Sequence, residues 1–196
     1  MIKIIDYRAG NAPSVLHAVR QIGLEAELVS SGKALGGASC IILPGVGSAK
    51  ATMDSLAEMQ MLPVLEKMVM QEKVTFLGIC VGLQILFDFS EEDDCRGLGW
   101  FKGRVVRFDN TQVRVPQMGW NEVSFTSGSE NGFFYFVNSY HAVAENPADV
   151  WAVADYGGDF TAAIHRENIF ATQFHIEKSG EAGLSLLKKI LEGNKC

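Results

Sequence analysis

A single cysteine stands between two glycines where a run of strand-forming residues gives way to apolar residues at helical spacing. Residues 75–84 read Thr-Phe-Leu-Gly-Ile-Cys-Val-Gly-Leu-Gln. A sharp strand-to-helix turn of this kind, a nucleophile elbow, lifts a nucleophile clear of the sheet, and flanking glycines leave room around it. The pattern predicts a strand that ends at Cys80, a helix over 83–89 and a reactive thiol. A buried structural cysteine is the alternative, which the two glycines disfavour.

Size and charge limit the classes of protein to which the chain can belong. It has 196 residues, 47% of them hydrophobic, and a net charge of −6. This length favours a single domain over residues 1–196. No cluster of lysines and arginines marks a nucleic-acid-binding surface. Charges interrupt every apolar run well short of the ~18 residues of a membrane span. We therefore expect small molecules or another protein as partners, with no nucleic acid and no membrane.

Cysteines and histidines are scattered rather than grouped. The four cysteines form no CxxC pair and follow no secretory leader, which favours a reducing, cytoplasmic location over a disulfide framework. The four histidines show no HExxH or comparable ligand spacing. We accordingly expect no metal site and no other cofactor.

The first part of the chain alternates between strand-like and helical patterns. Short apolar runs predict buried strands at 3–6, 26–29 and 40–43. Apolar residues at helical spacing predict a helix over 12–22, and 59–71 has helical composition. Such alternation implies parallel pairing, with helices on both faces of the sheet.

From about Cys95 the chain becomes rich in short β-forming runs separated by Asn, Gly, Pro and Asp. An amphipathic helix is predicted over 180–191. No linker divides the two halves, so we expect an α/β fold with one open mixed sheet, whose parallel core is flanked by helices. The strands predicted in this half are 103–108, 113–115, 133–137, 150–154, 161–165 and 169–174.

A cysteine nucleophile needs a base, because an ordinary thiol is mostly protonated at neutral pH. His175 is the best candidate, since it follows the predicted strand 169–174. On an extended backbone residues i and i+2 face the same side, so Glu177 can bond the imidazole and fix its tautomer. Taken singly, a structural histidine and a solvated glutamate are equally good interpretations. As a pair beside an elbow cysteine, they predict a triad.

Attack of a thiol on an amide creates an oxyanion, which backbone amides in a glycine-rich turn can stabilise. The segment Pro44-Gly45-Val46-Gly47 follows a predicted strand. It should therefore reach the same carboxyl edge of the parallel sheet as Cys80. For a PGxG sequence alone, an ordinary turn is the alternative.

Together these segments resemble the class I (triad-type) glutamine amidotransferases, whose glutaminase domain releases ammonia from glutamine through a cysteine thioester. Residues 6–11 read Asp-Tyr-Arg-Ala-Gly-Asn, similar to a DYGxGN opening. Residues 115–121 read Val-Pro-Gln-Met-Gly-Trp-Asn, similar to VPHMGWN, and residues 135–140 read Tyr-Phe-Val-Asn-Ser-Tyr, similar to YFVHSY. Within the family these segments resemble the glutaminase subunits of imidazole glycerol phosphate synthases, over nearly the whole chain.

The resemblance implies a flavodoxin-like fold, L-glutamine as the substrate and a heterodimer with a (β/α)₈ cyclase subunit. Ammonia would pass into that barrel, which makes imidazole glycerol phosphate and an aminoimidazole carboxamide ribotide in histidine biosynthesis. The implied triad is Cys80, His175 and Glu177. The implied oxyanion hole comprises Gly45, Val46, Gly47 and Val81. The implied glutamine-binding residues are Gln84, Ser139 and Tyr140. The residues implied near the partner are Asn11, Gln117, Trp120 and Asn121.

Four positions depart from the family pattern: Arg8 for glycine, Val81 for leucine, Asn138 for histidine and Ile176 for proline. Proline at 176 would fix the backbone between base and orienter. Isoleucine still suits an extended strand, so we expect the triad to survive. Three other interpretations stay open: an amidotransferase subunit for surface-sugar amidination, a catalytically silent scaffold that binds the barrel, and a cysteine peptidase. In a cysteine peptidase, the motif at residues 115–121 would have no role.

Overall fold

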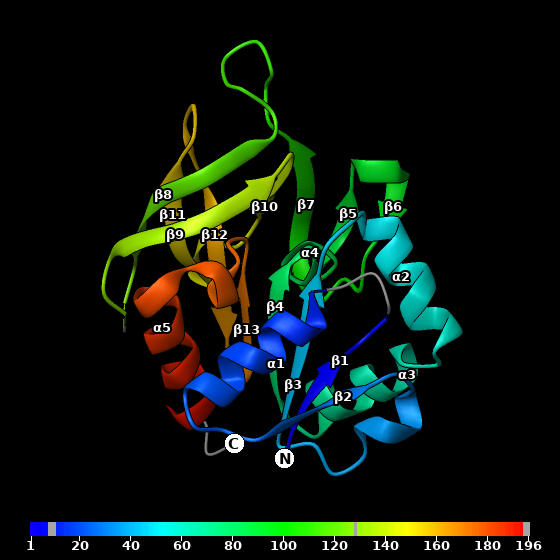
Figure 1. Ribbon diagram of the computed structural model, residues 1–196. Helices are drawn as coiled ribbons and strands as arrows, with labels where there is room; N and C mark the ends of the chain where they lie inside the picture. Colours follow the sequence, from blue (N-terminus) through cyan, green and yellow to red (C-terminus); the bar gives the residue numbers. More distant parts are fainter. Residues whose placement is uncertain (8–10, 128, 194–196) are drawn as a thin grey trace.

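Five parallel strands form the centre of the computed structural model, which describes residues 1–7, 11–127 and 129–193 (Figure 1). Their order across the sheet is β2-β1-β3-β4-β13. Every residue of β3 and β4 is buried, as expected for strands in a parallel sheet that is covered on both faces. The strands are β1 (Ile2–Ile5), β2 (Ala26–Val29), β3 (Cys40–Gly45), β4 (Thr75–Cys80) and β13 (Ile169–Thr172).

The second half of the chain extends this sheet, mostly with antiparallel strands. From β13 the order continues β12-β10-β7-β5-β6, and β11, β8 and β9 branch from β12. The predicted α/β class, a mixed sheet with a parallel core, is confirmed. These strands are β5 (Phe87–Ser90), β6 (Cys95–Arg96), β7 (Phe101–Arg107), β8 (Gln117–Phe125), β9 (Gly132–Asn138), β10 (Tyr140–Ala144), β11 (Val150–Asp155) and β12 (Asp159–Arg166).

Helices α1 and α5 lie against each other beside the sheet (Figure 1). No helix in the described ranges is long and apolar enough to cross a membrane. The α-helices are α1 (Ala12–Gln21), α2 (Ala49–Glu58), α3 (Leu62–Leu65), α4 (Val81–Gln84) and α5 (Gly180–Gly193). Short 3₁₀ turns are η1 (Gly32–Leu35), η3 (Glu92–Asp94), η4 (Pro147–Asp149) and η5 (Ile176–Lys178), and η2 (Glu66–Gln71) is π-helical.

The helix predicted over 83–89 is wrong beyond its first turn. Helix α4 ends at Gln84, and Phe87–Ser90 form β5, which pairs with β7 and β6. The aromatic residues Phe87 and Phe89 favour an extended strand once a neighbouring strand is available. This neighbour is distant in sequence, so helical spacing alone was misleading.

Two other predicted elements also need correction. No strand forms at 113–115, because the backbone amides of Gln112 and Val113 bond the Asp109 carbonyl in a turn. The helix predicted over 59–71 is divided into α3 and the π-helical η2. Helix α2 and strands β8 and β10 were not predicted, and β8 contains Gly119, which weakens a strand signal.

Candidate active site

Cys80 lies at the carboxyl end of β4, opposite Gly45 of β3. Its φ of 56° and ψ of −107° are a strained conformation for a residue with a side chain, as a nucleophile elbow requires. A Cβ at Gly78 would collide with the carbonyl oxygen of Gly82, and one at Gly82 with that of Leu43. The two glycines therefore allow the chain to turn back tightly over the sheet.

His175 follows β13, and the neighbouring strand β9 fixes its backbone. Its amide donates to the Tyr135 carbonyl (2.9 Å), and the Ser179 hydroxyl donates to the His175 carbonyl (2.7 Å). The preceding residue, Phe174, is fully buried and packs on Phe134 with ring centroids 4.3 Å apart. Core packing on one side of His175 thus sets the position of its imidazole.

The His175 imidazole and the Glu177 carboxylate form a buried pair. His175 Nδ1 donates to Glu177 Oε1 at 2.9 Å, and the two side chains are 1% and 0% exposed. Burial alone would lower the pKa of His175, but interactions with Cys80 and Glu177 outweigh it and raise that pKa to about 9. Burial likewise opposes ionisation of Glu177, yet His175 and Asn11 hold its pKa below the ordinary value.

The other imidazole nitrogen, Nε2, makes no hydrogen bond of normal geometry within the described residues. Catalytic hydrogen bonds are often long until a substrate binds. The structure therefore brings Cys80, His175 and Glu177 together in the order that nucleophile, base and orienter require.

Two glutamines connect the thiol to β10 through hydrogen bonds. Gln173 Nε2 donates to Cys80 Sγ at 3.6 Å, and Gln173 Oε1 accepts from Gln84 Nε2 at 3.0 Å. Gln84 Nε2 also donates to the Tyr140 carbonyl at 3.1 Å. Sequence reasoning missed Gln173, although it precedes His175 by two residues and so faces the same side of an extended chain.

A pocket of about 340 Å³ opens over Cys80. The sequence predicted seven of its other lining residues. Gly45, the strand partner of Cys80, does not line the pocket. Gly47 has a φ of +99°, a left-handed conformation that suits glycine. The lining residues are Val46, Gly47, Cys80, Val81, Gln84, Glu92, Pro116, Val137, Asn138, Ser139, Tyr140 and His175.

Glu92 is the acidic side chain among these lining residues, and the sequence gave no signal for it within a run of four acidic residues. Its Oε2 accepts from the backbone amide of Ala49 at the start of α2 (2.9 Å). Burial raises the pKa of Glu92, and the Ala49 bond opposes this. Among the described residues, no group of three or more His, Cys, Asp or Glu side chains could hold a metal.

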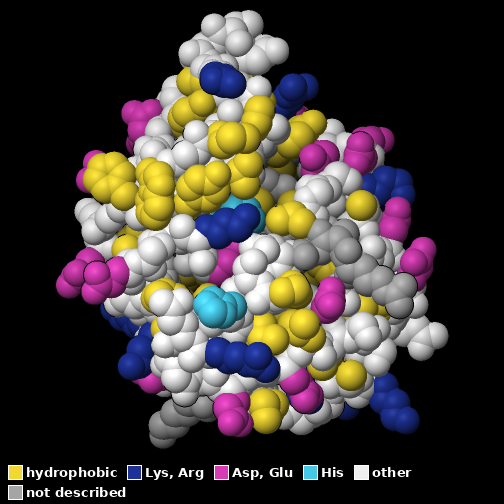
Figure 2. Space-filling view, in the orientation of Figure 1, with side chains coloured by type: hydrophobic (Ala, Val, Ile, Leu, Met, Phe, Trp, Pro, Cys, Tyr) yellow, Lys and Arg dark blue, Asp and Glu magenta, His cyan; other side chains and the backbone are white. Residues whose placement is uncertain are grey.

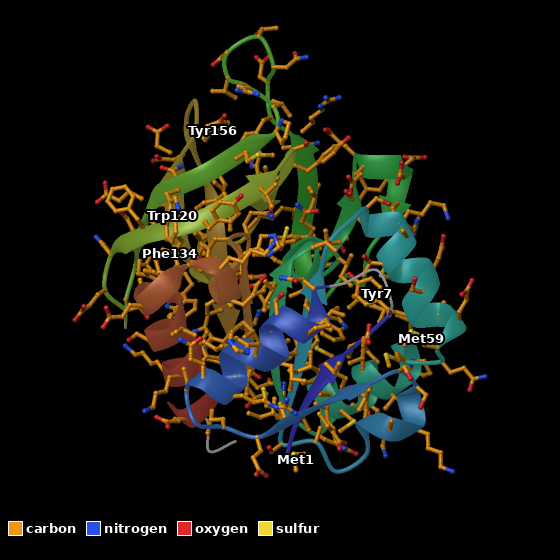
Figure 3. All side chains as sticks on the ribbon, viewed as in Figure 1. Met1, Tyr7, Met59, Trp120, Phe134 and Tyr156 are labelled. Atoms are coloured by element: carbon orange, nitrogen blue, oxygen red, sulfur yellow. The ribbon has the colours of Figure 1, made fainter. Side chains whose placement is uncertain are left out.

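The residues expected near a partner lie in different environments. Trp120 is exposed on β8 (Figure 3), whereas Gln117 is buried and its amide atoms bond no described residue. Asn121 Nδ2 donates to the Asp155 carbonyl at 2.7 Å, a bond between β8 and the last residue of β11. Asn11 Nδ2 donates to Glu177 Oε1 at 2.7 Å and so belongs to the triad's surroundings.

The residues at the four departures have different neighbours. Arg8 lies outside the described residues, with Ala9 and Gly10. The extended strand expected at Ile176 is wrong, because this fully buried residue begins the 3₁₀ turn η5. The contact between His175 and Glu177 is nevertheless present. Asn138 lines the pocket and donates to the Tyr140 carbonyl at 3.0 Å, and Val81 lines the pocket beside Cys80.

Tyr7, just before the segment that the structure leaves undescribed, is buried beside α2 (Figure 3). The Thr52 hydroxyl donates to its hydroxyl at 3.4 Å. Burial raises the pKa of the Tyr7 phenol, with a smaller contribution in the same direction from nearby Cys80. Tyr7 does not line the pocket over Cys80.

Comparison with known proteins identifies the family. The family model of class-I glutamine amidotransferases matches residues 3–192. The chain belongs to this family. It is 42% identical to "Imidazole glycerol phosphate synthase subunit HisH" of Leptospira interrogans, over 96% of this chain and 98% of that protein. It is 44% identical to the protein of the same name in Methanothermobacter thermautotrophicus, over 98% of each. The resemblance predicted from the motifs is confirmed.

Solved structures agree at the level of the fold. A "glutamine amidotransferase" crystal structure superposes with a TM-score of 0.82 and 19% identity, over 100% of this chain and 99% of that one. A chain of "PurLQS from Thermotoga maritima" gives a TM-score of 0.78 at 19% identity, over 99% and 98%. This amidotransferase, like its relatives, therefore has the predicted fold.

Proposed function

We propose that this amidotransferase is the glutaminase subunit of an imidazole glycerol phosphate synthase in histidine biosynthesis. It hydrolyses L-glutamine to glutamate and ammonia, and the ammonia passes to a (β/α)₈ cyclase subunit. The observation that carries the proposal is the buried Cys80–His175–Glu177 arrangement at the base of a pocket, in a chain whose full-length relatives bear that subunit's name.

The first half-reaction forms a thioester. His175 Nε2 accepts the thiol proton, and Cys80 Sγ attacks the side-chain amide carbon of glutamine. Glu177 stabilises the imidazolium that results. The tetrahedral intermediate then breaks its C–N bond, and the His175 proton moves to the departing nitrogen, which leaves as ammonia.

The second half-reaction regenerates the thiol. A water molecule gives a proton to His175 Nε2 as its oxygen attacks the thioester carbon, and the C–S bond breaks with return of that proton to sulfur. Glutamate is released. The Gln173 amide, with Nε2 3.6 Å from Cys80 Sγ, directs an N–H at the sulfur that reacts in both steps.

Backbone amides complete the chemistry. The oxyanion of each tetrahedral intermediate is assigned to the amide of Val81 and to amides of Gly45, Val46 and Gly47. Three of these residues, Val46, Gly47 and Val81, line the pocket beside Cys80. We further propose that docking of the cyclase orients these amides toward the oxyanion. The lone chain would then hydrolyse little glutamine.

The pocket also offers a means to select glutamine by its backbone groups. The Glu92 carboxylate complements the α-ammonium group, and its bond to the Ala49 amide fixes its orientation. Gln84, Ser139 and Tyr140 line the same pocket and are assigned to the rest of the substrate. A carboxylate at this place disfavours a peptide substrate, whose nitrogen carries no charge.

An exposed apolar surface supports a protein partner. Met118, Trp120 and Phe133 are 67%, 56% and 59% exposed and lie on the same outer face of β8 and β9. Figure 2 shows hydrophobic side chains gathered over these strands. Large exposed apolar patches mark interaction sites. We name Met118, Trp120 and Phe133 the docking ribbon and assign it to the cyclase.

Ammonia-transfer kinetics with and without a (β/α)₈ cyclase test the proposal. We expect glutamine to support product formation only with this chain present, one glutamate formed per product, and slow hydrolysis by the chain alone. Hydrolysis by the lone chain as fast as by the complex would contradict the activation hypothesis. Coupling only with a sugar-amidination synthase would replace the pathway, and absence of Cys80 labelling by a glutamine-analogue electrophile would favour a silent scaffold.

A further inference from the structure

Asn11 begins helix α1, but its side chain does not cap the helix. Its carbonyl accepts from the amides of Ser14 and Val15 (3.1 and 3.2 Å), which fixes the backbone. Its side chain makes no capping bond, although asparagine is among the best N-cap residues. Instead Nδ2 donates at 2.7 Å to Glu177, 166 residues further along the chain.

We propose that Asn11 is a positioning residue of the active site, a fourth member that holds the Glu177 carboxylate in register with His175. The inference deepens the proposed function and rests on its triad. Asn11 does not line the pocket over Cys80, so it acts through Glu177 and not on the substrate.

The arrangement of hydrogen bonds explains why a fourth residue is needed. Glu177 Oε1 accepts from both His175 Nδ1 and Asn11 Nδ2, at 2.9 and 2.7 Å, while Oε2 bonds no described side chain. A carboxylate with one donor can rotate about its terminal bond. Two donors that converge on Oε1 from different parts of the chain, one just before η5 and one just before α1, fix the plane of the group.

A groove next to Glu177 gives water a route to the bond between Asn11 and Glu177. A groove of about 370 Å³ between α1 and η5 is lined by Glu177, although the Glu177 side chain itself is fully buried. Removal of the Asn11 amide would let water from this groove compete for Oε1. It would also remove a donor that favours the ionised carboxylate.

The Asn11 donor determines the direction in which the pKa of Glu177 should change when Asn11 is replaced. Asn11 contributes to the lowered pKa of Glu177, so its loss raises that pKa, and the carboxylate becomes neutral at a higher pH as the solution is acidified. Asn11→Leu keeps the size of the side chain and removes the donor, so the fall of kcat at acidic pH should begin at a higher pH than in the wild type. Asn11→Asp places a second carboxylate against Glu177 and should raise that pH further. Asn11→Gln retains an amide and should restore part of the wild-type profile.

The experiment uses two readouts. The first is the pH dependence of glutamine hydrolysis by the chain with saturating cyclase, for which we expect a fall in kcat on the order of tenfold in Asn11→Leu with KM unchanged. The second is the ¹³C NMR titration of the Glu177 carboxyl carbon in the chain alone, which needs no substrate. An inactive wild type with a shifted titration in the variants would refute the proposed function and leave the positioning role intact.

Gln21→Ala, at the far end of α1 in the same groove, is the matched control and should match the wild type in both readouts. Superimposable Glu177 titrations in wild type, Asn11→Leu and Asn11→Asp would overturn the inference, whatever happens to stability. So would a raised KM at constant kcat, which would make Asn11 a substrate contact. Should Asn11→Leu fail to fold, Asn11→Asp carries the same titration test.

Discussion

The two faces of the β8–β9 pair have opposite environments. On the inner face Val123, Phe134 and Phe136 are at most 2% exposed, and Phe134 packs on the residue before His175. On the outer face the docking ribbon of Met118, Trp120 and Phe133 is more than half exposed. Alternate residues of the same strands therefore serve the catalytic core and an open surface.

This difference separates what the chain does for itself from what it leaves to a partner. The inner face completes a buried network in which the triad side chains have partners within the molecule. The outer face keeps apolar side chains in water, which is unfavourable until another protein covers them. Catalytic geometry and docking should thus be separable by mutation.

The largest expected effect comes from the thiol. Cys80→Ala should lower glutamine hydrolysis by about 10⁴-fold or more, since the nucleophile is lost. Association with the cyclase, measured by titration calorimetry, should be unchanged because the docking ribbon is intact. Cys95→Ala, a cysteine outside the pocket, is the control. An equally large loss of hydrolysis in Cys95→Ala would show that the assay reports disruption of the fold and not loss of the nucleophile.

The next effect is on stability and comes from His175. Its pKa of about 9 in the folded chain exceeds the ordinary 6.5, so its stabilisation is complete below pH 6.5 and is lost as pH rises through 9. The loss should reach roughly 3 kcal/mol in free energy of unfolding. Urea denaturation between pH 6 and 10 should show this fall in wild type and a smaller one in His175→Gln. His165→Gln, whose ring stacks on Phe170 outside the pocket, should behave like wild type.

Trp120→Ala addresses the outer face alone. Loss of a large aromatic side chain from the centre of an interface commonly costs ~2 kcal/mol, so the Kd for the cyclase should rise about 30-fold. Alkylation of Cys80 in the lone chain should not change. Leu28→Ala, an exposed residue on the distant edge strand β2, is the control for non-specific effects. A changed alkylation rate in Trp120→Ala would mean that the two faces are coupled.

The smallest effect is on substrate recognition. Glu92→Gln keeps an acceptor for the Ala49 amide but removes the charge that faces the pocket, so KM for glutamine should rise about tenfold. Steady-state kinetics with saturating cyclase measure it. Glu91→Gln is the neighbouring control, because Glu91 bonds the Arg107 amide and does not line the pocket. Equal KM values in the two variants would remove Glu92 from the substrate site.

Much of the fold could be predicted because its signals are local. Runs of apolar and β-forming residues located β1, β3 and β4, and period-3.6 spacing located α1 and α5. The spacing of His175 and Glu177 indicated their contact, although it forms at a 3₁₀ turn and not on an extended strand. The predictions failed where distant partners decide. Phe87–Ser90 became a strand because β7 lies beside it. At 113–115 the cause is local, because the Val113 amide bonds the Asp109 carbonyl in a turn.

The sequence by itself determined the elbow at Cys80, its two glycines, the base and orienter pair and the family. These depend on residues within a few positions of one another, where backbone geometry follows from local chemistry. Only the tertiary structure decided that Gln173 faces the thiol, that Glu92 enters the pocket and that Asn11 bonds Glu177 rather than capping its own helix. Such contacts join residues up to 166 positions apart, and no periodicity encodes them.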